Sequence, residues 1–528
     1  CVNGFLPGCV GGELTHLDYW PTGLLKKVTN PDASYIEYFY DAAHRLTEVK
    51  DGAFDRVVFT LDAMGNRTVE NTYDPSNALR RTHSRIYNTL NQLWKDVNAA
   101  GTANVTTTLG YDLNGDQTAV NAPLGRNSTN LYDELRRLKQ ITDPASGVTK
   151  FAYDAADNLT TVTDPRNLVT SYTYSGFGDL KTQTSPDTGL TTNTYDSGGN
   201  LDTSTDSRGA ITGYTYDALN RVTSASFTLG GITDQTISYG YDAGTNQNGL
   251  LTSATDAQHD LAWTYDSQGR ITGKGQTVGG VTLAIGYGYN SIGQLGNTLL
   301  PSGSSITFGY NANGQVTSLT LNGSTTILSN ITYESFGPIT GWSWGNGTTA
   351  SRDFDADGKI TQVDNANGAS FKTFAYDDAF RITDIVDVGN PALSWTYGYD
   401  ALDRLSSATS STVTQGWTYD ANGNRLTQTG TAPSAYTNAG TSNRATSISG
   451  SLTRSYGYDA AGNTRGWRRP AMGARQPPIP TMRWVSAFAV RHRRRPRSIS
   501  TMRPGIWRAS TPQPARSSRK RCGWEIRQ

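Results

Sequence analysis

The sequence predicts an all-β protein made of many β-hairpins in tandem, and three observations support this fold class. The dipeptide Tyr-Asp occurs thirteen times, and from Tyr132 to Tyr216 the repeat interval is 21 residues four times in succession, with Tyr174-Ser175 as a degenerate copy. Alternating aromatic and small polar residues, the period of a β-strand, precede the copies. The 528 residues include 56 Gly and 28 Tyr but only 17% charged residues, a composition that favours strands and turns over helices.

Each repeat is expected to form a strand, a turn and a second strand. Residues 213–216 (Gly-Tyr-Thr-Tyr) alternate as a strand does, and Asp217 can cap the following turn through its side chain. A Gly two or three positions later supplies the positive φ in many copies, and a β-branched strand such as residues 221–224 follows. A second turn, often Asp-Pro as at residues 164–165, returns the chain. Because a lone hairpin is marginal in water, we expect the units to pair edge to edge in one long sheet that coils on itself.

The Tyr-Asp pairs define the repeat, and we assign them a structural role. Aspartate oxygens accept hydrogen bonds from turn N–H groups, which favours a turn cap over an acid pair of the glycosidase kind. No metalloprotease, nucleophile-elbow or phosphate-loop motif is present, so no catalytic residue and no enzyme activity are predicted. The repeat-defining residues are Tyr132, Asp133, Tyr153, Asp154, Tyr195, Asp196, Tyr216, Asp217, Tyr265, Asp266, Tyr419 and Asp420.

The tandem pattern resembles the RHS or YD-repeat family over residues 15–464. Residues 153–160 (Tyr-Asp-Ala-Ala-Asp-Asn-Leu-Thr) and 265–272 (Tyr-Asp-Ser-Gln-Gly-Arg-Ile-Thr) carry this resemblance. It implies a spiral β-sheet wound into a hollow shell. In bacterial members the shell encloses a toxic C-terminal domain, and in the more distant teneurin-like animal relatives the repeats belong to a cell-surface adhesion protein. The aspartyl self-cleavage segment of bacterial members has no matching motif here, so self-cleavage is assigned to no residue.

Composition divides the chain into three parts: an irregular upstream end (residues 1–14), the repeat array (15–464) and an Arg/Pro-rich tail (465–528). The tail holds sixteen Arg and one Lys against one Glu, a net charge of +16, and the rest of the chain carries −15. Three interpretations of the tail are open: a basic nucleic-acid or membrane arm, a small cationic toxin and a shifted reading frame. We prefer the third, because another frame of codons for residues 476–488 permits a further Tyr-Asp repeat. We therefore expect a disordered tail and an incomplete shell.

One turn resembles a calcium-binding loop. In residues 353–364 the side chains of Asp353, Asp355 and Asp357, with Gly358, match the loop spacing, and Asp364 stands where the pattern places Glu. Calcium is therefore the one cofactor considered, with an ordinary turn as the preferred alternative, because the segment also fits the repeat.

We expect a non-enzymatic repeat shell of a bacterial toxin, whose partner is a C-terminal toxin cargo absent from this chain. The alternative is a cell-surface carbohydrate-binding or adhesion protein, in which tryptophans such as Trp342 and Trp344 stack on sugars. The array itself is not expected to bind nucleic acid. No run of about 18 apolar residues predicts a transmembrane segment, and we expect a secreted or cell-surface location although no signal peptide is visible.

Overall fold

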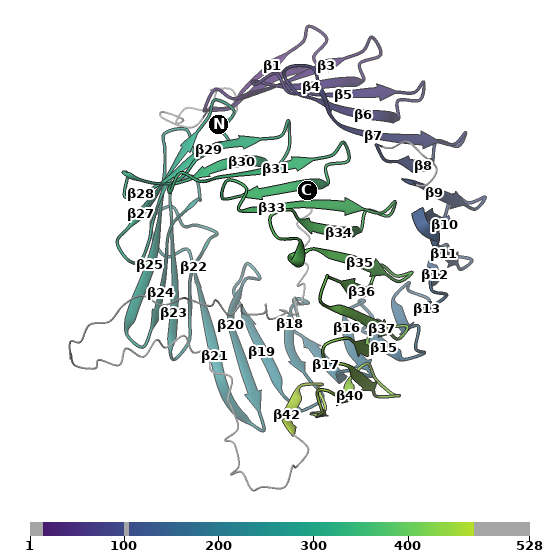
Figure 1. Ribbon diagram of the computed structural model, residues 1–528. Helices are drawn as coiled ribbons and strands as arrows, with labels where there is room; N and C mark the ends of the chain where they lie inside the picture. The colour runs from purple at the N-terminus through teal and green to yellow at the C-terminus, as the bar shows by residue number, and fades with distance from the viewer. Residues whose placement is uncertain (1–13, 100–104, 469–528) are drawn as a thin grey trace, which may run out of the picture. The chain divides into compact units, whose positions relative to one another are not determined.

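The computed structural model describes residues 14–99 and 105–468. In these residues the chain forms a single sheet of 42 strands, in which each strand pairs antiparallel with the next along the chain (Figure 1). No α-helix occurs in this part of the chain, and two short 3-10 turns, η2 (Pro123–Gly125) and η3 (Pro391–Leu393), join neighbouring strands. The predicted all-β fold is confirmed. None of the described segments is a helix long and apolar enough to cross a membrane.

The strands follow one another with short turns between them. The first eighteen are β1 (His16–Tyr19), β2 (Leu25–Thr29), β3 (Tyr35–Tyr40), β4 (Leu46–Asp51), β5 (Arg56–Leu61), β6 (Arg67–Tyr73), β7 (Leu79–Tyr87), β8 (Leu93–Val97), β9 (Thr106–Tyr111), β10 (Gln117–Ala122), β11 (Arg126–Tyr132), β12 (Leu138–Thr142), β13 (Val148–Tyr153), β14 (Leu159–Thr163), β15 (Val169–Tyr174), β16 (Leu180–Ser185), β17 (Gly189–Tyr195) and β18 (Leu201–Thr205). The next ten are β19 (Ile211–Tyr216), β20 (Val222–Leu229), β21 (Ile232–Tyr241), β22 (Leu251–Thr255), β23 (His259–Tyr265), β24 (Ile271–Val278), β25 (Val281–Tyr289), β26 (Leu295–Leu299), β27 (Ser305–Tyr310) and β28 (Val316–Leu321). The last fourteen are β29 (Thr325–Tyr333), β30 (Ile339–Trp344), β31 (Thr349–Phe354), β32 (Ile360–Asn365), β33 (Ser370–Tyr376), β34 (Ile382–Asp387), β35 (Trp395–Tyr399), β36 (Leu405–Thr409), β37 (Thr414–Tyr419), β38 (Arg425–Thr429), β39 (Ser434–Asn438), β40 (Ala445–Gly450), β41 (Arg454–Tyr458) and β42 (Thr464–Arg468).

Two kinds of turn alternate along the sheet. The Tyr-Asp turn follows the aromatic residue that ends a strand, and the return turn joins that repeat to the next one. At the Tyr-Asp turn the register shifts by one residue, for example between Thr215 and Tyr216, which is a β-bulge. The fourth residue after the aromatic has positive φ, 77° at Gly269 and 64° even at His44, which explains why Gly is frequent at this position.

The sheet is a single layer, so it lacks a thick core. The buried apolar residues of the described chain are few and scattered, and no large side chain is fully enclosed. Most strand residues are half-buried on both faces. The order of the structure therefore depends on contacts between neighbouring hairpins rather than on one central core.

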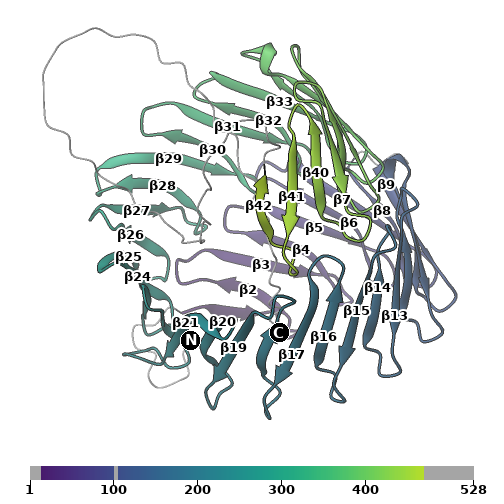
Figure 2. The same ribbon diagram turned by 90° about the horizontal axis from the view of Figure 1, so that it is seen from below.

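The sheet coils until its last part lies against its first part. We call residues 30–210 the first winding and residues 290–463 the second winding. Hydrogen bonds between them join residues 254 to 280 positions apart, and Figures 1 and 2 show the two arcs of strands side by side. The line of contact between them is called the seam. β1 and β42 each pair with one neighbour only, so the sheet remains open in the part of the chain described.

The first described strand of the array, β1, begins at His16. At the other end, β42 extends to Arg468, four residues past the expected limit of 464, because its backbone continues to pair with β41. The predictions for residues 1–13 and for the tail from 469 onward, the shifted reading frame included, lie outside the described residues.

Candidate functional site

The candidate functional elements are the Tyr-Asp turns and the seam, since both give the chain its coiled form. In a Tyr-Asp turn one carboxylate oxygen accepts two backbone N–H groups. Asp133 Oδ1 accepts from Leu135 at 3.0 Å and from Arg137 at 2.9 Å. The other carboxylate oxygen receives the Arg137 guanidinium at 2.8 Å from Nε. These hydrogen bonds, the guanidinium first, hold the pKa of Asp133 below its usual range.

The other predicted aspartates lie in the same kind of turn. Each accepts the N–H groups two and four residues ahead, as at Asp154, Asp196, Asp217, Asp266 and Asp420. Neighbouring turn aspartates therefore serve separate turns. Within the described residues, no group of three or more His, Cys, Asp or Glu side chains is arranged to hold a metal ion.

Most repeat tyrosines bond to the previous hairpin, a role that sequence reasoning missed. The hydroxyl of Tyr153 donates to the carbonyl of Leu138 at 2.9 Å, and that of Tyr216 donates to the carbonyl of Leu201 at 2.9 Å. The predicted tyrosines Tyr132, Tyr153, Tyr195, Tyr216, Tyr265 and Tyr419 all donate in this way. The acceptor carbonyl belongs to the first residue of the strand that follows the preceding Tyr-Asp turn. The sequence signal that could have revealed this contact is the aliphatic residue that stands six positions after most repeat tyrosines.

An arginine five residues after the aromatic joins two repeats. Arg137 binds its own Asp133, donates from Nη1 to the carbonyl of Asp154 at 3.0 Å, and stands 4.8 Å from the Tyr153 ring centre. Arg381 and Arg404 make equivalent contacts. A guanidinium over an aromatic face gains a cation–π attraction, so each such arginine ties one turn to the next.

At the seam, the Tyr-Asp turns of the second winding meet the return turns of the first. Four arginines beside return turns reach carboxylates of the opposing winding. The ion pairs are Arg80–Glu334 at 2.6 Å, Arg126–Asp403 at 2.6 Å, Arg166–Asp420 at 3.3 Å and Arg208–Asp459 at 3.6 Å. Uncharged contacts lie between them, such as the backbone N–H of Thr82 donating to the carbonyl of Ala356 at 3.0 Å. The seam thus has a fixed register.

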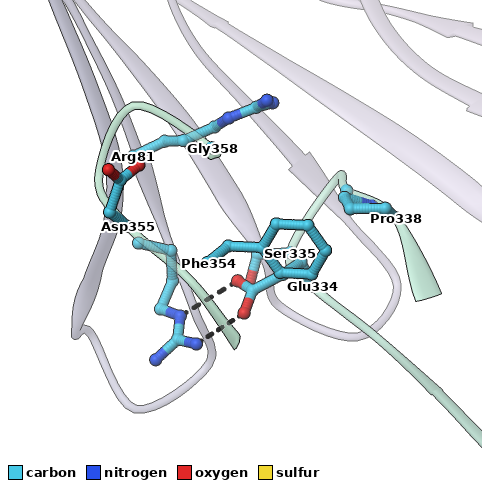
Figure 3. A pocket seen from close by; sticks show the side chains of 9 residues that line it. Arg81, Glu334, Ser335, Pro338, Phe354, Asp355 and Gly358 are labelled. Atoms are coloured by element: carbon cyan, nitrogen blue, oxygen red, sulfur yellow. Dashed lines mark hydrogen bonds and ion pairs between the residues drawn. The ribbon is translucent and has the colours of Figure 1, made fainter. Parts of the chain in front are cut away.

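A small pocket of the described chain lies at this seam. Glu334 accepts two hydrogen bonds from Arg80, from Nε at 3.0 Å and Nη2 at 2.6 Å, and the Phe354 ring and Pro338 line the space beside them (Figure 3). The free volume is about 10 Å³, roughly the room for one water molecule. This pocket is a joint between windings rather than a ligand site.

In one return turn at the seam, the pKa values of two aspartates are shifted upward, opposite to that of Asp133 in its Tyr-Asp turn. Burial raises the pKa of Asp51, and the nearby charge of Asp55 adds to the rise. Burial also raises the pKa of Asp55, whose Oδ1 accepts the Ser335 hydroxyl at 2.5 Å across the seam. The charged forms of these two carboxylates are therefore disfavoured in the folded chain.

The four aspartates of the calcium-like loop are not brought together. Asp355 caps its turn, and Asp357 accepts the backbone N–H of Ala99 at 2.7 Å across the seam. Lys359 Nζ lies 3.2 Å from Asp355 and 2.9 Å from Asp357. Asp353 and Asp364 lie in strands β31 and β32, where Asp364 accepts from the N–H of Gly368 at 2.8 Å. Calcium binding at this loop stays a prediction.

The tryptophans considered for sugar stacking contact other side chains of the chain. Trp342 and Trp344 form an edge-to-face pair with ring centres 5.6 Å apart, and the Arg352 guanidinium lies 4.2 Å from the Trp342 ring centre. Trp344 is 40% exposed, so its ring keeps some free surface. Protein contacts explain the Trp342 ring, and glycan binding remains a prediction.

Comparison with known proteins finds matches to two family models. The family model of the RHS repeat matches residues 19–53, 132–169 and 153–190, and that of the teneurin YD-shell matches residues 302–390. These matches agree with the RHS/YD-repeat family that the tandem Tyr-Asp pattern predicts. No match is found among the curated proteins.

Solved structures share the coiled sheet. The Photorhabdus luminescens Tc holotoxin pore with a mutation in TccC3 matches with a TM-score of 0.68 at 14% identity, over 87% of this chain and 28% of that one. The TcdB2-TccC3-TEV structure matches with a TM-score of 0.68 at 13% identity, over 87% of this chain and 29% of that one. The structure of TcdB2-TccC3 without its hypervariable C-terminal region matches with a TM-score of 0.67 at 14% identity, over 87% of this chain and 29% of that one. This chain spans less than a third of those proteins and shares their fold.

Proposed function

We propose that this chain is part of the repeat shell of a bacterial toxin, which encloses and helps to deliver a toxin domain that the chain itself lacks. The observation that carries the proposal is the seam. It locks a single-layer sheet into a coil through contacts between residues 251 to 280 positions apart. A coil of this kind can wall off a space without a solid core.

The fold shared with Tc toxin structures supports the same proposal. The role of such a wall is steric, because the turn aspartates are occupied by their own turns and the described residues gather no group of metal ligands. The proposed location is the secreted or surface-exposed fraction of a bacterium. The toxin cargo is the proposed partner of this chain. Any toxic activity resides in the cargo and not in the chain.

The test is a protection experiment on the full chain. A small protease-sensitive reporter domain is joined to the C-terminal end, and its half-life in trypsin is measured. The control replaces the four seam arginines (Arg80, Arg126, Arg166 and Arg208) by Ala, with retained strand content checked by circular dichroism. We expect a longer reporter half-life in the intact coil. Equal half-lives in both proteins would contradict the shell.

A glycan-binding adhesin is the second candidate, favoured only by the partly free ring of Trp344. A glycan array probed with the full chain separates the two functions. The shell predicts no glycan signal above that of the Trp344→Ala variant. A specific signal that the variant loses would favour the adhesin.

A further inference from the structure

The seam shows how one winding of this sheet recognises another. In the second winding, the residue three positions after the repeat aromatic points across the seam. Asn313 donates to Asp51 Oδ2 at 3.4 Å, and Asp357 accepts the N–H of Ala99 at 2.7 Å. Asn422 donates to Asp164 in the same way. This third position is therefore one of those that a Tyr-Asp turn presents to an opposing return turn, beside the first position at Glu334, Asp420 and Asp459.

In the first winding, four Tyr-Asp turns carry Ala43, Asn114, Ala156 and Gly198 at the same position. The other four turns, and the next Tyr-Asp turn of the chain, carry large apolar side chains there that nothing in the described chain covers. Their exposed fractions are 75% for Met64, 72% for Leu90, 67% for Leu135, 97% for Phe177 and 72% for Leu219. These residues stand three positions after Leu61, Tyr87, Tyr132, Tyr174 and Tyr216.

The apolar residues at this position of the second winding are less exposed. Phe336 is 38% exposed, and Ile292 and Leu402 are half-buried. The seam explains this difference in exposure. The Tyr-Asp turns of the second winding contact the first winding, whereas no described residue contacts the Tyr-Asp edge of the first winding in this way. Exposed apolar side chains at turn tips are unfavourable in water, so a row of them marks an interaction surface.

The exposed side chains stand on a rigid base. The backbone N–H of Leu135 and that of Leu219 each donate to the turn aspartate, at 3.0 Å and 2.9 Å. Since neighbouring strands are about 4.8 Å apart, hairpins repeat about every 10 Å along this edge. A surface that receives these side chains in register must repeat at the same spacing, as a second row of hairpin turns does.

The chain carries a second free edge with suitable chemistry. The return turns of the second winding at residues 300–304, 322–324, 345–348, 366–369, 388–394, 410–413, 430–433 and 451–453 contain no charged residue. They also present partly exposed apolar groups, with Val388 at 50%, Leu393 at 55% and Leu452 at 38%. By contrast, the return turns buried at the seam carry charges such as Asp55, Arg166 and Arg208, which form the intramolecular contacts.

We propose that two copies of this chain associate head to tail, with the uncharged return turns of one second winding seated on the apolar Tyr-Asp edge of the first winding of the other copy. This intermolecular contact has the same arrangement as the internal seam, because return turns of one winding meet Tyr-Asp turns of another. Because the two surfaces differ, the contact is heterologous and leaves one free edge of each kind on a dimer. The proposal does not depend on the cargo proposed above.

The experiment measures the molar mass of the full chain by light scattering over a dilution series up to about 100 µM, where a complex with a micromolar Kd is populated. Three purified variants are compared, each checked for folding by circular dichroism. The edge variant is Leu135→Glu, Phe177→Glu and Leu219→Glu. The return-turn variant is Val388→Glu, Leu393→Glu and Leu452→Glu. The control variant is Ile86→Glu and Leu131→Glu, at exposed strand positions outside both edges.

We expect association of the wild type and the control, and a Kd at least tenfold weaker for the edge variant and for the return-turn variant alone. A mixture of these two variants should form a dimer and nothing larger, since each supplies the surface that the other has lost. A monomeric wild type overturns the proposal and leaves the edge to a different protein. Unchanged association of the edge variant, or no dimer in the mixture, also overturns it.

Discussion

The hydroxyl of Tyr174 donates a 2.9 Å hydrogen bond to the carbonyl of Leu159 in the preceding hairpin. Tyr172 stands two residues earlier in the same strand, β15, and its hydroxyl has no polar partner in the described part of the chain. Two tyrosines of one strand thus differ in a single contact, which provides a matched pair of substitutions.

Replacing Tyr174 by Phe should lower the free energy of unfolding by about 1 kcal/mol, the usual net value of one hydrogen bond. The carbonyl of Leu159 loses its hydroxyl partner while the ring and its packing remain. The control, Tyr172→Phe, should change the free energy of unfolding by much less. Urea denaturation of both variants measures the difference, and equal losses would show that the tyrosine hydroxyl does not join the hairpins.

Replacing Asp154 by Asn should lower the melting temperature at pH 7. The pKa of Asp154 is lowered by hydrogen bonds from the Asn158 side chain and then from the Asn158 and Ala156 backbone. A lowered pKa in the folded state means that the ionised carboxylate contributes stability above its unfolded pKa, and that this stability is lost as the pH falls through the folded pKa. The wild type and the variant should therefore converge below about pH 4.

Calorimetry between pH 7 and pH 2.5 tests this. Asp234→Asn is the control, because Asp234 lies exposed in β21 without a polar partner in the residues described. A difference between wild type and Asp154→Asn that stays constant with pH would contradict the role of the charge.

Replacing Asp51 by Asn should raise the free energy of unfolding at pH 7, which is the opposite of the effect expected for Asp154→Asn. Burial, and then repulsion from Asp55, raises the pKa of Asp51. A raised folded pKa favours the protonated form, whose stability is complete at low pH and is lost as the pH rises through the folded pKa. Asn removes the charge and retains an oxygen for the N–H groups of Ala53 and Asp55. We expect a gain of roughly 0.5–1 kcal/mol at pH 7, small because the half-buried charge is screened by water, and no gain near pH 3.

Replacing Glu334 by Gln should loosen the seam locally. The carboxylate holds the Arg80 guanidinium by two hydrogen bonds, and partly exposed pairs of this kind contribute roughly 0.2–1 kcal/mol. Amide hydrogen exchange of a peptide containing Thr82, whose N–H crosses the seam to Ala356, should accelerate. Peptides of β13 to β15, away from this contact, provide the internal reference. Uniform acceleration across the sheet would indicate general destabilisation instead.

The calcium-like loop gives a further test. Because Lys359 Nζ already lies within 3.2 Å of Asp355 and Asp357, millimolar calcium should leave the melting temperature of the wild type unchanged. Replacing Lys359 by Met removes the competing cation and frees both carboxylates. A clear calcium-dependent rise in the wild type would instead support the loop as a calcium site.

Local features of this fold were predictable from the sequence, because their causes lie within one repeat. The aspartate of most Tyr-Asp turns bonds to N–H groups two and four residues ahead, so Asp133 and its turn could be placed from the motif alone. The tyrosine hydroxyl reaches the preceding hairpin, and only the regular spacing pointed in that direction.

The seam could not be predicted in this way. Asp357 fits a calcium loop in sequence, yet its partner is the N–H of Ala99, 258 residues away. The distance along the chain at which one winding meets the next depends on the twist and curvature accumulated over many strands. No single repeat contains that quantity.

The long separation across the seam has a consequence for synthesis of the chain. A hairpin contact closes within about two dozen residues, so strands can pair soon after they leave the ribosome. The contact between Arg80 and Glu334 must wait for 254 further residues, on the order of tens of seconds at ordinary elongation rates. During that interval the charged return turns of the early strands lack their partners in the second winding, and the seam has not yet formed. Pauses in translation after the codons for β18 would lengthen this exposed period, and faster elongation would shorten it.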